Sequence, residues 1–179
     1  MRGDESGAGA GTMRLFPATV VFLDDSSHRF TLDKKAKGQD LLTAVFQHLE
    51  LTEREYFGLV WSEGGAALPP GHAPDVTRWL DPAKPVRKQM RVKGVAAITL
   101  YFRLKFYVTD PSRLQEEYTR YHAYLQVKHD LTVGRLVAPV STVCLLTSYA
   151  VQSSLGDWDP DTSRPPYLGK TTNTSSYSD

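Results

Sequence analysis

A chain of 179 residues is long enough for one domain of ordinary size or two small ones. Hydrophobic residues make up 41% of it and charged residues 23%, as in soluble globular proteins, and a net charge of +1 argues against nucleic-acid binding. No apolar run reaches the roughly 20 residues of a membrane-spanning helix, and the N-terminus lacks the apolar core of a signal peptide. A single cysteine, Cys144, excludes an internal disulfide and favours a reducing compartment, with the cytoplasm as the default.

The first part of the chain has the pattern of a hairpin followed by a helix. Residues 1–16 are rich in Gly and Ala and are predicted to be disordered. Residues 19–23 (TVVFL) and 29–32 (RFTL) are predicted strands, joined by the turn residues 24–27. After Gly38, apolar residues at spacings of three and four predict an amphipathic helix with these buried positions: Leu41, Leu42, Val45, Phe46 and Leu49. This order is typical of the opening of a ubiquitin-like β-grasp fold.

Three further extended segments complete the predicted sheet. Residues 56–61 (YFGLVW) predict a strand in which Gly58 marks a close backbone approach. Residues 76–81 predict a short extended segment after an exposed Gly- and Pro-rich loop. Residues 98–108 (ITLYFRLKFYV) predict a central strand that closes the sheet by pairing with residues 19–23.

Two helices are predicted after the last strand. The first begins at a cap formed either by Asp110 with Pro111 or by Ser112, and it ends near Leu131. Its predicted buried stripe consists of Leu114, Tyr118, Tyr121 and Leu125.

The second helix is predicted from about residue 141 to residue 155 and ends at Gly156. It is apolar on more than one side, so it requires several packing neighbours, and its Cys144 is predicted to be a buried structural thiol. About six such side chains left exposed would forfeit about 9 to 18 kcal/mol of burial, as much as the net stability of a domain. The polar residues after Asp159 are predicted to be a disordered tail.

Seven motifs in this order resemble the FERM domain of the band 4.1, ezrin, radixin and moesin superfamily, and its band 4.1-like branch most closely. They are KKAKGQDLL (34–42), YFGL (56–59), WLDPAK (79–84), RLKFYVTDP (103–111), EEYTRYHAYLQVKHDL (116–131), GRL (134–136) and SYAVQSSLGDWDP (148–160). The resemblance implies an α+β chain with a ubiquitin-like β-grasp lobe at 17–109 and a partial helical lobe, similar to acyl-CoA-binding proteins, at 110–159. The segments 1–16 and 160–179 are then disordered, and the domain is expected to be truncated within its second lobe, without the PH-like third lobe.

No constellation of catalytic or metal-binding residues is visible. The five histidines show no ligand spacing and are interpreted as polar surface residues: His28, His48, His72, His122 and His129. There is no nucleophile elbow, P-loop or kinase signature, so the sequence predicts neither an enzyme nor a cofactor.

A basic segment is the one candidate binding site for a lipid headgroup. Its residues are Lys84, Arg87, Lys88, Arg91 and Lys93. In the ezrin-like branch a lysine pair just after the equivalent Trp-Leu motif contributes to phosphoinositide binding, whereas here Lys84 is followed by Pro85. Each basic residue near an anionic membrane contributes about 1 kcal/mol, although plain solvated charge at a strand edge is the competing interpretation.

The resemblance implies a non-enzymatic adaptor at the cytoplasmic face of the plasma membrane. Its expected partners are cytoplasmic tails of membrane proteins, cytoskeletal or scaffold proteins and anionic phospholipids, with no nucleic acid. The alternative is the targeting segment of a FERM-containing tyrosine phosphatase. A ubiquitin-like modifier is disfavoured because the chain ends in Ser178-Asp179 and its last strand continues into a helix.

Overall fold

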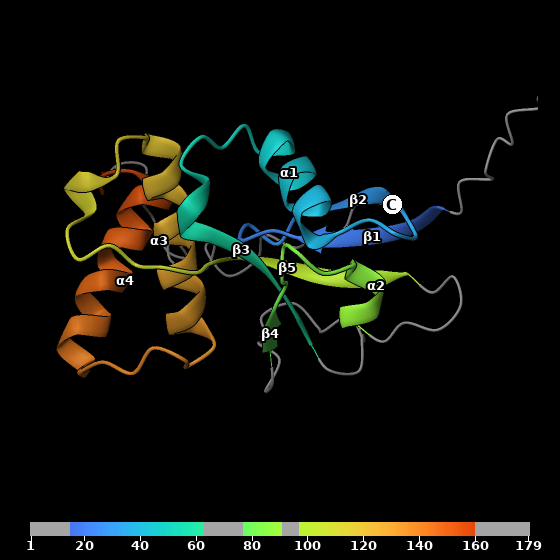
Figure 1. Ribbon diagram of the computed structural model, residues 1–179. Helices are drawn as coiled ribbons and strands as arrows, with labels where there is room; N and C mark the ends of the chain where they lie inside the picture. The colour runs from blue at the N-terminus through green and yellow to red at the C-terminus, as the bar shows by residue number, and fades with distance from the viewer. Residues whose placement is uncertain (1–14, 63–76, 91–96, 160–179) are drawn as a thin grey trace, which may run out of the picture. The chain divides into compact units, whose positions relative to one another are not determined.

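The structure, a computed structural model, describes residues 15–62, 77–90 and 97–159 (Figure 1). It divides into two compact units, residues 1–129 and residues 130–179, and each is described here by itself. The segments predicted to be disordered at both ends lie outside the described residues, apart from the first residues of the first strand. Among the described residues, no helix is both long and apolar enough to cross a membrane.

The first unit is built on a mixed five-stranded sheet in the order β2-β1-β5-β3-β4 (Figure 1). β1 and β5 are parallel, with Ala18 opposite Ile98 and Val21 opposite Tyr101, and the other neighbours are antiparallel. The predicted pairing of the last strand with the first is therefore confirmed. The strands are β1 (Leu15–Val21), β2 (Ser27–Asp33), β3 (Phe57–Ser62), β4 (Thr77–Trp79) and β5 (Ile98–Leu104).

Helix α1 (Gly38–His48) lies over one face of this sheet (Figure 1). Its N-terminus is held by the Asp40 carboxylate, which accepts a hydrogen bond of 2.8 Å from the backbone N–H of Lys37. Four of the five apolar positions predicted from the spacing are buried, because they point into the core formed with the sheet: Leu41, Leu42, Val45 and Phe46. The pattern thus predicted both the helix and the face that packs.

The last strand ends earlier than the apolar run predicted. The backbone N–H groups of Lys105 and Phe106 both donate to the carbonyl oxygen of Tyr56, at 2.7 and 3.2 Å, so the ladder stops at β5. The Asp110 carboxylate then accepts hydrogen bonds from the backbone and hydroxyl of Ser112, at 3.0 and 2.7 Å. This cap starts only the 3₁₀ helix η2 (Pro111–Arg113), and the prediction of a long helix beginning there was wrong.

Helix α3 (Glu117–Thr132) confirms only part of the predicted stripe: Leu114, just before the helix, and Leu125 are buried. Tyr118 and Tyr121 are 44% and 48% exposed, so their prediction as core residues was wrong. The buried positions are Thr119, His122, Leu125 and Gln126. Gln126 is buried because its side-chain oxygen accepts a hydrogen bond of 3.2 Å from the Leu104 N–H at the end of β5.

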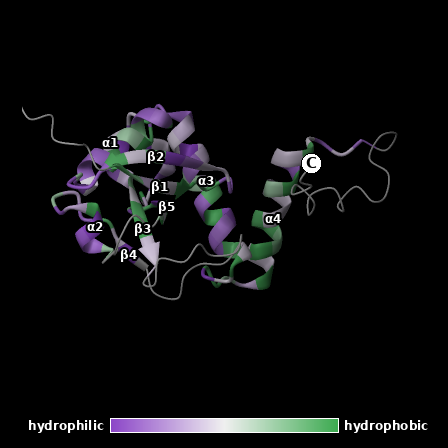
Figure 2. Ribbon diagram, turned by 90° about the vertical axis from the view of Figure 1, so that its right-hand side faces the viewer, coloured by the Kyte–Doolittle hydropathy of each residue, from purple (hydrophilic) through white to green (hydrophobic). Residues whose placement is uncertain are grey.

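The second unit contains α4 (Val140–Leu155), which ends at Gly156 in a left-handed conformation with φ of 79°. None of the side chains of α4 is buried, although much of the helix is hydrophobic (Figure 2). The shortage of packing neighbours predicted from periodicity is therefore seen. Cys144 is exposed, and the prediction that its thiol is buried was wrong because no element within the described residues covers it.

Candidate interaction surface

The predicted basic site falls on the loop before α2 (Val86–Gln89) and on that helix. We call the described part of it, Lys84, Arg87 and Lys88, the α2 surface. Backbone hydrogen bonds fix the loop to the start of α1: Gly38 N–H donates to the Lys84 carbonyl at 3.0 Å, and Gln39 N–H donates to the Pro82 carbonyl at 2.9 Å. The position of Lys84 is thus set by the fold.

Close packing explains why the sequence has glycine at position 38. A Cβ atom on Gly38 would lie 2.4 Å from the carbonyl oxygen of Asp81. Gly58 in β3 is similar, since a Cβ atom there would lie 2.9 Å from the ring of Trp79. A close backbone approach was predicted at Gly58, but the close neighbour there is a side chain; the close approach of backbone occurs at Gly38, where it was not predicted.

The side chain of Gln89 makes the loop rigid. Its oxygen accepts a hydrogen bond of 2.8 Å from the Asp81 N–H. Its amide nitrogen donates to the carbonyl oxygens of Asp81 and Lys84, both at 2.9 Å. One half-buried amide therefore replaces the backbone partners that a strand or longer helix would have supplied.

The charges of the α2 surface are partly neutralised within it. The ammonium group of Lys84 lies 2.6 Å from the carboxylate of Asp81. Hydrogen bonds from Lys84 and from the Ala83 N–H lower the pKa of Asp81, so this carboxylate stays charged. The guanidinium of Arg87 lies 5.6 Å from the centre of the Phe16 ring, and Lys88 is exposed. The structure thus brings three of the predicted residues together, while Arg91 and Lys93 lie outside the described residues.

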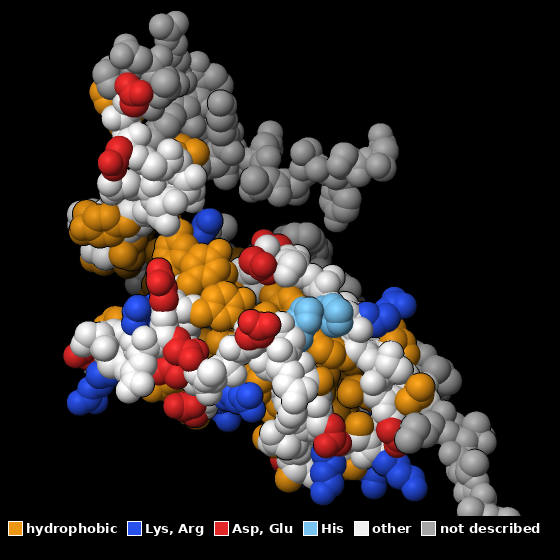
Figure 3. All heavy atoms as spheres, turned by 90° about the horizontal axis from the view of Figure 1, so that it is seen from above, with side chains coloured by type: hydrophobic (Ala, Val, Ile, Leu, Met, Phe, Trp, Pro, Cys, Tyr) orange, Lys and Arg blue, Asp and Glu red, His pale blue; other side chains and the backbone are white. Residues whose placement is uncertain are grey.

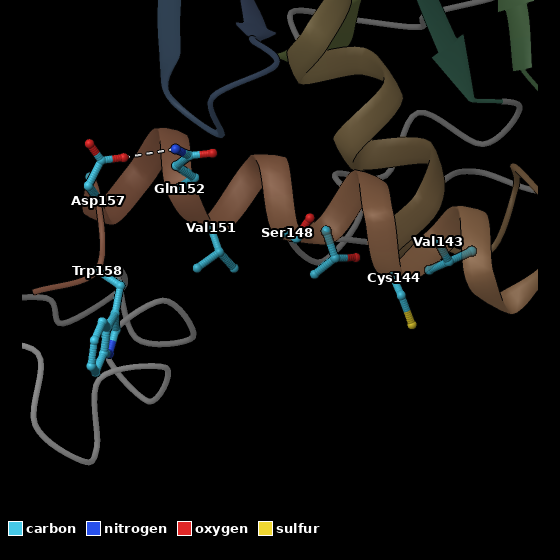
Figure 4. A pocket seen from close by; sticks show the side chains of 9 residues that line it. Val143, Cys144, Ser148, Val151, Gln152, Asp157 and Trp158 are labelled. Atoms are coloured by element: carbon cyan, nitrogen blue, oxygen red, sulfur yellow. Dashed lines mark hydrogen bonds between the residues drawn. The ribbon is translucent and has the colours of Figure 1, made fainter. Parts of the chain in front are cut away.

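The second unit has an open depression of about 630 Å³ along α4 (Figure 4). Cys144, Val151 and the indole of Trp158 lie on the same side of the helix. A hydrogen bond of 2.8 Å from the Gln152 amide to the Asp157 carboxylate holds the turn that carries Trp158. Sequence reasoning identified the apolar helix but not this depression, because the turn after Gly156 has no periodicity to read.

The histidines divide between surface and core. His28 and His48 are exposed and stack with ring centres 4.1 Å apart, as surface residues should. His122 is only 4% exposed, so its prediction as a surface residue was wrong. Both of its ring nitrogens are buried without a hydrogen-bond partner, and this burial lowers the pKa of His122, against a small opposing effect of Asp24. Among the described residues, no group of three or more potential ligands could hold a metal ion.

The missed residues of α3 left a signal in the sequence. Thr119, His122 and Gln126 recur at steps of three and four, the same periodicity as an apolar stripe. Sequence reasoning missed this stripe because it looked only for apolar residues at this spacing. The reason for burying Gln126 becomes visible only in the structure. The Leu104 N–H at the end of β5 donates its hydrogen bond to the Gln126 side chain.

Comparison with known families gives the match that this geometry suggests. The family described as the FERM N-terminal domain matches residues 20–92, and the family described as the FERM central domain matches residues 109–178. The chain belongs to the FERM domain superfamily. The ubiquitin-like lobe and helical lobe expected from the resemblance are therefore present in this FERM chain, in the expected order.

Individual relatives of this FERM chain include band 4.1 proteins and a phosphatase. It is 46% identical over 149 residues to Tyrosine-protein phosphatase non-receptor type 4 of Homo sapiens, covering 83% of this chain and 15% of the relative. It is 42% identical over 150 residues to Protein 4.1 of Canis lupus familiaris, covering 83% of this chain and 17% of the relative. The chain thus spans less than a fifth of the length of these two relatives.

A solved structure shows the same FERM fold. The crystal structure of the FERM and C-terminal domain complex of Drosophila Merlin is similar with a TM-score of 0.71 and 28% sequence identity. The similarity covers 90% of this chain and 54% of the Merlin chain. Both units of the present FERM chain thus follow a known structure for most of their length.

Proposed function

We propose that this FERM chain is a non-enzymatic adaptor that links cytoplasmic tails of membrane proteins to the cortical cytoskeleton. The observation that carries the proposal is the pair of FERM matches in family order, which together extend from residue 20 to residue 178. The family resemblance implies this role and the cytoplasmic face of the plasma membrane as its location. Function depends on the sites that a fold carries, and backbone hydrogen bonds fix the α2 surface to the start of α1, in keeping with a module that binds through its surface.

The α2 surface is the part of the adaptor that we propose contacts anionic phospholipids. Its three basic residues lie on one short segment, and the backbone of Lys84 is fixed by hydrogen bonds. Since Asp81 pairs with Lys84, the attraction should be weaker than three unpaired cations would give. Lipid contact is therefore proposed as an addition to protein binding.

A pulldown with the full chain tests the adaptor proposal. The immobilised chain is incubated with a panel of synthetic cytoplasmic tails and, separately, with detergent-extracted cortical skeleton. The matched control is the variant Val45→Asp, which places a charge at a fully buried core position and should unfold the sheet. We expect the native chain to retain at least one tail and a skeletal component. Retention equal to that of the control would contradict the proposal.

A second function is favoured by the similarity to Tyrosine-protein phosphatase non-receptor type 4. The chain would then be the targeting part of a longer phosphatase. Immunoprecipitation with an antibody against the described sheet, followed by a phosphotyrosine-peptide phosphatase assay, separates the two. Precipitated phosphatase activity from a polypeptide larger than 20.0 kDa would favour the targeting segment, and its absence would favour the free adaptor.

A further inference from the structure

An aromatic pair on α3 forms a surface that the proposed function does not use. Tyr118 and Tyr121 are half-exposed, and their rings stack with centres 6.5 Å apart and 19° between the planes. We call these two residues, with Asp24 and Glu50, whose charges act on Tyr118, the tyrosine surface. All four belong to the first unit. Large ring faces open to solvent on a helix are uncommon without a function, because tyrosine gains stability from burial.

The floor of the tyrosine surface is rigid. The buried ring of His122 packs edge-on beneath Tyr118, with centres 4.6 Å apart. The same ring contacts Phe57 and Phe102 in the sheet, at 5.8 and 5.5 Å. The tyrosine rings are therefore supported from below, and binding a ligand to them loses little conformational entropy. The lowered pKa of His122 keeps this floor neutral near pH 7.

The electrostatic environment of the tyrosine surface is negative. Burial raises the pKa of Tyr118, and the charges of Asp24 and Glu50 raise it further. The nearby guanidinium of Arg120 donates to the backbone carbonyls of Leu114 and Gln115, so it is held by the start of the helix. On the face seen in Figure 3, hydrophobic side chains are bordered by Asp and Glu and also by Lys and Arg side chains.

The Asp24 carboxylate is held in a tight turn, and the backbone of Glu50 is fixed at the end of α1. Asp24 is fixed because it accepts hydrogen bonds from the backbone and hydroxyl of Ser26, at 3.1 and 2.6 Å. Glu50 follows the end of α1 with a left-handed φ of 54°, and Asp25 has a left-handed φ of 64°. The turn therefore holds the Asp24 charge in place, whereas for Glu50 only the backbone is fixed.

We propose that the tyrosine surface binds an arginine or lysine side chain of a basic peptide. The cation would lie against the tyrosine rings, whose faces are electron-rich, while Asp24 and Glu50 supply opposite charge at the rim. Arginine should bind better than lysine, because its planar guanidinium stacks on an aromatic ring and pairs with carboxylates through several donors. This inference depends on the proposed adaptor function in one respect: the basic peptide is expected to be part of a cytoplasmic tail.

The test measures binding of a fluorescent Gly-Ser peptide with three arginines to the full chain by polarisation. Asp24→Asn with Glu50→Asn removes both rim charges. Asparagine at 24 still accepts from Ser26, and asparagine at 50 tolerates a left-handed φ. The matched control is Asp33→Asn with Asp40→Asn, which removes one charge at the end of β2 and one in the first turn of α1, where asparagine can still accept from the Lys37 N–H. A third variant, Tyr121→Ser, removes one ring.

We expect the rim variant and Tyr121→Ser each to weaken binding about fivefold, and the matched control to change it less than twofold. A peptide with lysine in place of arginine should bind more weakly to the native chain. Equal weakening by the rim variant and the matched control would overturn the inference, because it would show an effect of net charge alone. Unchanged binding in Tyr121→Ser would overturn it as well.

The same variants separate this inference from the adaptor proposal. If cytoplasmic tails are retained equally by the native chain and by the rim variant, the inference fails and the adaptor stands. If the arginine peptide binds as expected but no tail or skeletal component is retained, the adaptor fails and the tyrosine surface stands.

Discussion

Gly38 is the residue at which α1 and the α2 surface meet, and its missing side chain makes room for a backbone oxygen. Gly38→Ala would place a Cβ atom 2.4 Å from the Asp81 carbonyl oxygen. Backbone on both sides must then shift, so we expect a loss of about 2 kcal/mol in the free energy of unfolding, measured by urea denaturation. Gln39→Ala, at an exposed position one residue later, is the control and should change stability by less than about 0.5 kcal/mol.

His122 makes the stability of the first unit dependent on pH. Burial lowers its pKa in the folded chain, so below its unfolded pKa of about 6.5 the unfolded chain binds a proton that the folded chain does not. Stability should therefore be full above about pH 6.5 and fall at lower pH, by at most about 1.4 kcal/mol per pH unit.

Urea midpoints at about pH 7.5 and pH 5.5 measure this dependence. His122→Leu should reduce the difference between the two midpoints, and His28→Gln, at an exposed position, should leave it unchanged. A native chain equally stable at both pH values would contradict the assignment.

The pairing of Asp81 with Lys84 limits the attraction of the α2 surface for anionic vesicles. Asp81→Asn removes the carboxylate charge but retains an oxygen for the Ala83 N–H, so binding to phosphatidylserine-containing vesicles should increase about fivefold. Lys88→Gln should lower it by a similar factor, and Lys128→Gln on α3 is the control for charge elsewhere. Cosedimentation measures the change, and equal binding by the native chain and Asp81→Asn would argue against the lipid contact.

At the scale of elements, helices α1 and α3 differ in how well the sequence predicted their buried faces. Helix α1 has one apolar stripe and a sheet to cover, so spacing predicted its buried face. Helix α3 buries Thr119, His122 and Gln126, and its packing depends on where β5 leaves an unsatisfied N–H group. Hydrophobic periodicity carries no information about that group, so the tyrosines of α3 were assigned to the wrong side.

Helix α4 should be the least protected long helix against hydrogen exchange. None of its side chains is buried, so little burial opposes local opening, whereas β1 and β5 lie in the middle of the sheet. Exchange followed by mass spectrometry should show amides of α4 exchanging faster than those of β1 and β5. Equal protection of all three would mean that α4 opens only with the sheet.

At the scale of the whole molecule, the sequence predicted the central position of β5 and its pairing with β1. The run of residues 98–104 is too apolar for an edge strand. The sequence did not predict where the compact units divide. The division falls within α3, between residues 129 and 130, and no Gly, Pro or change of composition marks that point. The lobe boundary expected from the family, between residues 109 and 110, stays a prediction.

Exposed apolar groups on α4 should make the free chain self-associate. Leu145 and Tyr149 are one turn apart and both more than half exposed. Leu145→Ser with Tyr149→Ser should increase the fraction of monomer in sedimentation velocity runs at rising concentration, since each lost contact removes about 1 to 2 kcal/mol of association. Ser153→Ala, on the same helix, is the control and should not change it. A native chain that stays monomeric at every concentration would show that these side chains do not drive self-association.

The parallel neighbours β1 and β5 come from opposite ends of the first unit's strand sequence. During synthesis, a ribosome must translate nearly the entire described sheet before β1 meets its second partner, and until then one edge of β1 has open hydrogen-bonding groups. Closing so distant a pair is slow compared with forming a hairpin. The nascent chain therefore passes through a period in which chaperones, or another copy emerging nearby, compete for that edge.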